Sequence, residues 1–235
     1  MDAESPKLDE SSRERFHTVV MKIQYLAKRV RPDLLTASTF LNSRVQAPTE
    51  QDALKLDRVV DYLYSTRSLG IKLGGPKGVL SVTAYVDASY GVHHDFKSQT
   101  GSVTSVGGGP VHVSASKQKL NSKSSTESEL IGLSDSLSQV LWIRDFLIEQ
   151  GYDLGPAIVK QDNQSTMIMA NKGISTSERT RHIGIRYFWV KDRIESNEIS
   201  LEYLETENMI ADILTKPLQG SHFRRMRGLP LNWDE

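Results

Sequence analysis

The sequence predicts an α/β protein, in which a mixed five-stranded sheet flanked by helices follows a small helical segment. Three observations lead to this prediction. Residues 13–73 carry apolar side chains at steps of three and four, the spacing of amphipathic helices. After the turn-forming stretch "LGGPKG" at 73–78, stretches rich in β-branched residues begin. Strand-like and helical stretches then alternate to the end of the chain, which is the order expected of helices packed on a sheet.

Bulk composition restricts the class of protein. The 235 residues include 38% hydrophobic and 25% charged residues, an ordinary globular balance. Lys and Arg number 29, and so do Asp and Glu, so any nucleic-acid binding must rely on local patches of charge. The absence of cysteine excludes disulfides and thiolate metal sites. No run approaches the roughly 20 apolar residues of a membrane span, so no membrane partner is expected.

The first part of the chain predicts a tail and three helices. Residues 1–12 are polar and are expected to be a disordered tail, and residues 13–73 form one helical segment. Its second helix reads "RPDLLTASTFLNSRV", with Pro32 in the first turn. The third begins after Thr49, a plausible N-cap. Its predicted buried face consists of Leu54, Val59 and Leu63.

The remaining residues, 74–235, predict the sheet and its helices. The predicted strands cover 79–89, 98–108, 110–116, 157–163 and 199–206. The predicted helices cover 124–151, 164–173 and 178–197. A last helix is expected to begin within 208–218, where Pro217 interrupts or ends it.

Four acidic side chains stand at comparable places, at strand ends or in first turns of helices: Asp87, Glu127, Asp162 and Asp212. In open sheets, strand ends and nearby helix starts form the crevice that binds ligands. Converging carboxylates raise one another's pKa, and divalent cations relieve the repulsion. Oxygen ligands without cysteine favour Mg²⁺ or Mn²⁺. Two such ions about 3.5–4 Å apart can clamp a phosphodiester.

Three of these acids also have an ordinary structural explanation. Glu127 and Asp212 stand in helix first turns, where the helix dipole favours acids. Asp162 before Asn163 is compatible with an Asx turn. Glu129 lies two residues after Glu127 and so points to a different side of the helix. We therefore interpret Glu129, like Asp95 and Asp135, as a surface acid.

Five blocks of sequence carry a family resemblance. They read "YVDAS", "LNSKSSTESEL", "KQDNQSTMIMANKG", "ERTRHIGIRYFWVKDRI" and "ETENMIADILTKPL", in this order over residues 80 to 230. The series resembles the ribonuclease H domain of copia-type retrotransposon polyproteins. The earlier "RPDLLTA" is similar to a recurrent motif of the stretch between polymerase and nuclease in that family. The resemblance is specific because all five blocks occur together.

The resemblance implies a ribonuclease H-like fold for 74–235, preceded at 13–73 by the segment that follows the polymerase core. It implies that Asp87, Glu127, Asp162 and Asp212 bind two Mg²⁺ or Mn²⁺ ions and are catalytic. The implied activity is hydrolysis of the RNA strand of RNA–DNA hybrids during reverse transcription. The implied partners are the hybrid and the polymerase part of the same polyprotein. The implied location is intracellular, in the cytoplasm, in virus-like particles or in the nucleus.

Polar and basic residues near these acids predict a substrate surface: Ser89, Lys119, Lys123, Asn163, Arg179, Arg181 and His182. Charge clusters are usually solvated faces, but the position of the lysines just before Glu127 favours phosphate contact. His182 is equally explained as a helix N-terminal packing or capping residue. Polymerase activity is not expected, because no Tyr-x-Asp-Asp turn occurs. Two rival functions stay open. The first rival is an inert remnant that binds nucleic acid or protein without cutting it. The second is another nuclease of this fold, such as an integrase or resolvase.

Overall fold

The computed structural model describes residues 5–74, 80–172 and 181–232, without the side chains of residues 181–183. Two compact units divide the chain, Met1–Ile71 and Lys72–Glu235, a boundary two residues from the predicted one. Within the described ranges, no helix is both long and apolar enough to cross a membrane.

The first unit contains three α-helices: α1 at Glu10–Arg29, α2 at Leu35–Asn42 and α3 at Glu50–Ser65. Helix α1 contributes Phe16, Val20 and Ile23 to the core, at the spacing that the sequence predicts. Thr49 caps α3 in a reciprocal arrangement with Asp52, a capping box. The predicted buried face of α3 is wrong, because Leu54 is 55% exposed and Val59 and Leu63 are only half-buried. Asp52 and Leu56 are the buried residues of α3 instead.

The "RPD" motif of the first unit is a buried polar clamp. The Arg31 guanidinium donates to both carboxylate oxygens of Asp33, over 2.9 and 2.7 Å. Tyr62 on α3 donates its hydroxyl to the same carboxylate, at 2.7 Å. Both charges are buried, so their pairing compensates for lost solvation. In this structure the motif therefore joins α3 to the turn before α2.

The predicted disordered tail is too long. Asp9 caps α1, which begins at Glu10, and the Asp9 carboxylate accepts from the backbone N–H of Ser12 at 2.9 Å. Backbone bonds from Leu8 to Pro48 and from Glu50 to Pro6 tie this stretch to the start of α3. The composition of residues 5–12 is polar, but pairing of their backbone still orders them. Residues 1–4 lie outside the described residues.

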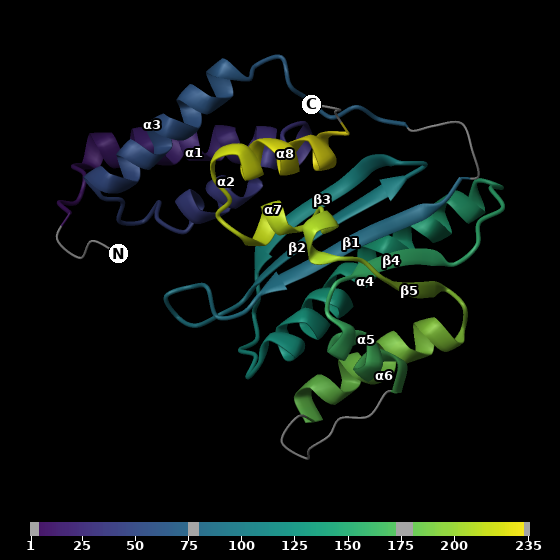
Figure 1. The fold of residues 1–235 in the computed structure, drawn as a ribbon. Coiled ribbons are helices and arrows are strands. Elements are labelled where there is room, and N and C mark those ends of the chain that lie inside the picture. Colours follow the sequence, from purple (N-terminus) through teal and green to yellow (C-terminus); the bar gives the residue numbers. More distant parts are fainter. Residues whose placement is uncertain (1–4, 75–79, 173–180, 233–235) are drawn as a thin grey trace. The chain divides into compact units, whose positions relative to one another are not determined.

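The second unit is built on a five-stranded sheet in the order β3-β2-β1-β4-β5 (Figure 1). The strands are β1 at Val82–Ser89, β2 at Gln99–Val106, β3 at Gly109–Lys117, β4 at Ala157–Gln161 and β5 at Ile199–Tyr203. Strands β1, β2 and β3 pair antiparallel, whereas β1, β4 and β5 pair parallel. The predicted mixed five-stranded sheet flanked by helices is confirmed.

Opposite faces of this sheet carry different helices. Helix α4 at Ser125–Glu149 packs Leu133 and Leu137 against Val86 and its neighbours on β1. Helices α5 at Gln164–Lys172 and α6 at Arg181–Glu195 lie beside α4. The short α7 at Asp212–Thr215 contacts β2 and β1 on the other face. Alternation along β1 places Val86 toward α4 and Asp87 toward α7.

The C-terminal prediction was incomplete. The predicted last helix is only the four-residue α7, and Lys216 before Pro217 is already extended. A second helix, α8 at Gly220–Leu231, follows and packs near β3. Its sequence contains Gly228 and Pro230, which weaken a helical signal. Tertiary packing overrides that weak propensity, because Met226 and Leu231 are buried.

Candidate active site

Asp87 comes from the central strand of the sheet and is only 3% exposed. Its partner on β2 is Gly101, so no neighbouring side chain on that strand covers the carboxylate. The cover comes from α7, where Thr215 donates its hydroxyl to Asp87 Oδ2. A buried carboxylate without a cation is costly, so this position calls for a compensating charge.

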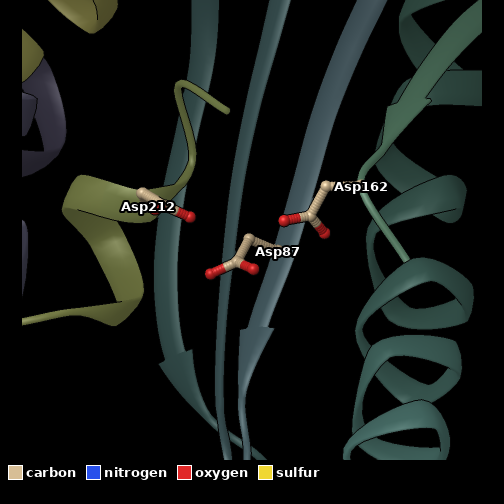
Figure 2. Close-up of side chains that lie close together, drawn as sticks. All are labelled: Asp87, Asp162 and Asp212. Atoms are coloured by element: carbon tan, nitrogen blue, oxygen red, sulfur yellow. The ribbon is translucent and has the colours of Figure 1, made fainter. Parts of the chain in front are cut away.

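Three of the four predicted acids converge. Asp162 directly follows β4, which pairs parallel with β1, and Asp212 is the first residue of α7. Figure 2 shows the carboxylates of Asp87, Asp162 and Asp212 turned toward one another. One oxygen from each lies within 4.8 Å of the others. The strand ends and α7 therefore create a compact acidic triad.

The structure corrects the interpretation of Glu129. Its side chain is not on the surface: the residue is 5% exposed and lines the same open cavity as Asp87 and Asp162. The cavity has a volume of ≈ 590 Å³. Glu129 stands four residues before Leu133 and eight before Leu137, so it continues the helix face that packs on β1. That spacing is a sequence signal for a buried position, but Glu127 has a similar one, because it stands three residues before the buried Leu130.

Glu127 occupies a different place. Its carboxylate accepts the backbone N–H of Lys123 at 2.7 Å, and its own N–H donates to the Ser124 hydroxyl at 3.2 Å. Ser124 and Glu127 are three residues apart, the spacing of a capping box. Within the described residues, the group of acids close enough to share a metal contains Asp87, Asp162 and Asp212, not Glu127. The structure thus assigns to Glu127 a capping role and to Glu129 the place beside the triad.

Each of the four clustered acids is held by a hydrogen-bond donor. Gln161, at the end of β4, donates to Glu129 Oε2 at 3.2 Å and accepts from the Asp162 N–H at 3.0 Å. Thr206 donates to Asp162 Oδ2 at 2.9 Å, from the 3₁₀ turn Thr206–Asn208. Lys216 pairs with Asp212 Oδ2 at 2.7 Å. Sequence reasoning missed Gln161 and Thr206 because their partners are 32 and 44 residues away along the chain.

Burial governs the pKa values in the cluster. Desolvation raises the pKa of Asp87 to about 6, against the lowering effects of the Thr215 bond and the Lys216 charge. Desolvation also raises the pKa of Glu129 to about 9, and the charges of Asp87 and Asp162 add to this increase. The pKa of Asp212 is likewise raised by burial, with Lys216 acting in the opposite direction. Without a cation, Asp87, Glu129 and Asp212 therefore hold protons more strongly than exposed acids do.

The donor set fits a hard divalent cation. All candidate ligands are carboxylate oxygens, which Mg²⁺ and Mn²⁺ prefer. Asp212 Oδ1 is buried and has no hydrogen-bond partner in the described part of the chain. A buried acceptor without a partner is costly, and a bound cation would satisfy it. The three carboxylates and the unpartnered oxygen thus suit a divalent cation.

The predicted substrate residues divide into three groups. Ser89 and Asn163 line the cavity beside Asp87 and Asp162, and Asn163 also accepts the Thr166 N–H at 3.0 Å. Lys119 and Lys123 are exposed in the loop before α4. Arg179 lies outside the described residues, as do the side chains of Arg181 and His182 in the first turn of α6.

Comparison with known proteins relates the chain to transposon polyproteins. It is 33% identical over 212 residues to the retrovirus-related Pol polyproteins from transposons RE1 and RE2 of Arabidopsis thaliana. Each match covers 89% of this chain and 14% of the relative, so the chain spans a small part of their length. No protein-family model matches the chain. Among solved structures, it is similar to LC11 ribonuclease H1 isolated from compost, with 15% identity and a TM-score of 0.45. That likeness covers 57% of this chain and 92% of the other.

Proposed function

Because the chain is homologous over most of its length to the Pol polyproteins of copia-type retrotransposons, we propose that it is a metal-dependent endonuclease. It hydrolyses the RNA strand of RNA–DNA hybrids during reverse transcription, as a partner of the polymerase part of the polyprotein. The observation that carries this proposal is the convergence of Asp87, Asp162 and Asp212 beside a cavity that Asp87, Asp162 and Glu129 line. An intracellular location is consistent with this role and stays a prediction.

The four carboxylates would hold two Mg²⁺ or Mn²⁺ ions, since their formal charge matches that of two divalent cations. Such ions supply an activated water and stabilise the leaving oxygen of a phosphodiester. The protein's own groups fix the ligands: Thr215 holds Asp87, Thr206 holds Asp162, and Gln161 holds Glu129. Preorganised ligands matter because loss of an outer partner typically costs about 10–100-fold in metal affinity or activity.

The cavity suits the sugar–phosphate backbone of a nucleic acid better than a base. It is open and polar, with Ser89 and Asn163 next to the acids, where hydroxyl and amide groups can bond sugar or phosphate. Hybrid duplexes are recognised by shape and 2′-hydroxyls, not by base sequence. We therefore propose that cleavage depends little on sequence, and that Ser89 and Asn163 contact the strand beside the scissile phosphate.

A matched pair of variants on α4 tests the proposal. In a cleavage assay with labelled hybrid and Mg²⁺, Glu129→Gln should lower the rate on the order of a hundredfold or more, because it removes a ligand charge. Glu127→Gln, two residues earlier, should stay within a few-fold of the unmodified protein. Asp162→Asn should abolish cleavage with the fold intact by circular dichroism, and EDTA should stop the unmodified enzyme.

Each other result has a definite meaning. An inactive Glu127→Gln beside an active Glu129→Gln would restore the sequence-based assignment of the acids. Binding of hybrid without any metal-dependent cut would favour the inert remnant. Preferred cleavage of duplex DNA would favour an integrase-like or resolvase-like nuclease.

A further inference from the structure

Building on the proposed function, we propose that Lys216 is a tethered counter-cation of the active site. Its ammonium balances the acidic cluster in the metal-free protein and is replaced there when a divalent cation binds. Two observations suggest this role: Lys216 Nζ lies 2.7 Å from Asp212 Oδ2, and Lys216 lines the cavity that contains Asp87, Glu129 and Asp162.

The backbone places Lys216 at this position. Lys216 is the C-cap residue of α7 and has an extended conformation, with φ −115 and ψ 137. Pro217 follows it, and a residue before proline is restricted to such extended conformations. The helix therefore ends at Thr215, and the lysine lies four residues after Asp212, within reach of its carboxylate. Thr215 and Lys216 thus bind two different acids of the cluster, Asp87 and Asp212.

The Lys216 ammonium can move away from Asp212. The Lys216 side chain is 38% exposed, whereas that of Asp212 is only 8% exposed. One end of the ion pair is thus fixed in the protein, and the other can move into solvent along a flexible stem. In the described part of the chain, Lys216 is also the one basic residue that lines the cavity. This side chain therefore offsets part of the charge of the metal-free cluster at close range.

A lysine ammonium and a divalent cation cannot share Asp212 without repulsion at close range. Lys216 should therefore stabilise the metal-free state and weaken metal binding. Removal of the lysine charge should destabilise the metal-free state and strengthen metal binding. A residue that only packs against α7 would change stability equally with and without metal, so metal affinity separates the two roles.

The test is a calorimetric titration of the full chain with Mn²⁺, in the absence of nucleic acid. Lys216→Met should bind Mn²⁺ roughly tenfold more tightly than the unmodified protein, because a nearby positive charge is removed. Its melting temperature in EDTA should fall, and the difference should largely vanish at saturating Mn²⁺. Lys216→Arg should restore the original affinity, and Lys216→Gln provides a second neutral variant if Lys216→Met does not fold.

Lys191→Met is the matched control. Lys191 forms an ion pair with Glu195 at the same four-residue spacing, over 3.4 Å on α6, and the variant removes the same charge from the chain. Its Mn²⁺ affinity should be unchanged. Equal or weaker Mn²⁺ affinity of Lys216→Met would overturn the role of Lys216 while leaving the proposed nuclease intact. Absence of Mn²⁺ binding in every variant and in the unmodified protein would overturn both.

Discussion

At the scale of single residues, the protein concentrates charge where solvent is scarce. Asp87 and Glu129 are almost fully buried, and Asp162 and Asp212 stand beside them. Hydrogen bonds from Thr206, Gln161 and Thr215 orient these acids but do not neutralise them. The raised pKa values are the consequence, because protonation is the cheapest way to bury a carboxylate without a cation.

These pKa values predict how stability depends on pH without metal. The folded pKa of Asp87 is about 6 against an ordinary 3.8, and that of Glu129 is about 9 against 4.5. Between the ordinary and folded values the native state binds more protons than the unfolded chain, so a rise in pH destabilises it. In EDTA, the free energy of unfolding should therefore fall steadily from about pH 4 to about pH 9.

Urea unfolding at several pH values measures this fall. Asp87→Asn and Glu129→Gln should each flatten the curve, since the neutral side chains do not titrate. Saturating Mg²⁺ should also reduce the fall, because the cation binds the ionised form. A free energy of unfolding that stays level or rises over this range without metal would contradict the prediction.

At the scale of elements, the site depends on a helix too short to be stable alone. Helix α7 has four residues, and isolated helices of this length do not persist in water. Its stability comes from docking on β2 and β1, where Ile213 and Leu214 are buried. Docking delivers Asp212 and Thr215 to Asp87 together, so any change that lifts α7 off the sheet should dismantle the cation site.

Gly101→Ala should be such a change. A Cβ at position 101 would lie 2.6 Å from Leu214 Cβ and 3.0 Å from the Ala211 carbonyl oxygen. These atoms belong to or adjoin the backbone, so no rotation of a side chain can relieve the overlap. We expect a loss of about 1–3 kcal/mol in the free energy of unfolding and weaker Mn²⁺ binding. Chemical denaturation and metal titration measure the two effects.

Gly155→Ala is the matched control, because nothing lies within 4 Å of a Cβ built at position 155. It should leave both the free energy of unfolding and the Mn²⁺ affinity unchanged within error. Wild-type Mn²⁺ affinity in Gly101→Ala would show that α7 can shift without disturbing the site.

At the scale of the whole molecule, formal net charge is zero, so the grip on a nucleic acid must be local. The loop before α4 offers Lys119 and Lys123, both exposed. Lys117, on the neighbouring strand, differs from them, because its ammonium pairs with Asp95 at 2.7 Å. Lys119 and Lys123 are thus available to contact a phosphate, whereas the charge of Lys117 is already paired with Asp95.

This difference predicts the salt dependence of hybrid binding, measured in the non-cleaving Asp162→Asn background. If Lys119 and Lys123 each contact one phosphate, each substitution by Ala should make the slope of log affinity against log salt shallower by about 0.7–0.9. Lys117→Ala should change the slope less, because the Lys117 ammonium is already paired with Asp95 and so neutralises less phosphate charge. An unchanged slope in the Lys119/Lys123 double variant would leave the arginines of α6 as the leading candidates.

Local signals account for most of what the sequence predicted correctly. The capping box at Thr49, the alternation along β1 and the apolar face of α4 all operate within a few residues. The acids at strand ends were identified by the same logic, since parallel strands end at one edge of a sheet. Glu127 and Glu129 could not be separated this way, because both stand near the start of one helix and only its orientation on the sheet distinguishes them.

The sequence by itself determined the order of the five strands and of the helices up to α7, and it placed Asp87, Asp162 and Asp212 at the ends of elements. Only the tertiary structure decided which glutamate joins them, where α7 docks and which donors hold each carboxylate. The physical reason is the range of the interactions. Caps, turns and periodicity are encoded within one or two turns of chain, whereas Thr215 reaches Asp87 from 128 residues away. Gly101 has no side chain, so α7 can pack closely on β2 at this position. The sequence around Gly101 does not reveal this role, because α7 and β2 meet only in the folded protein.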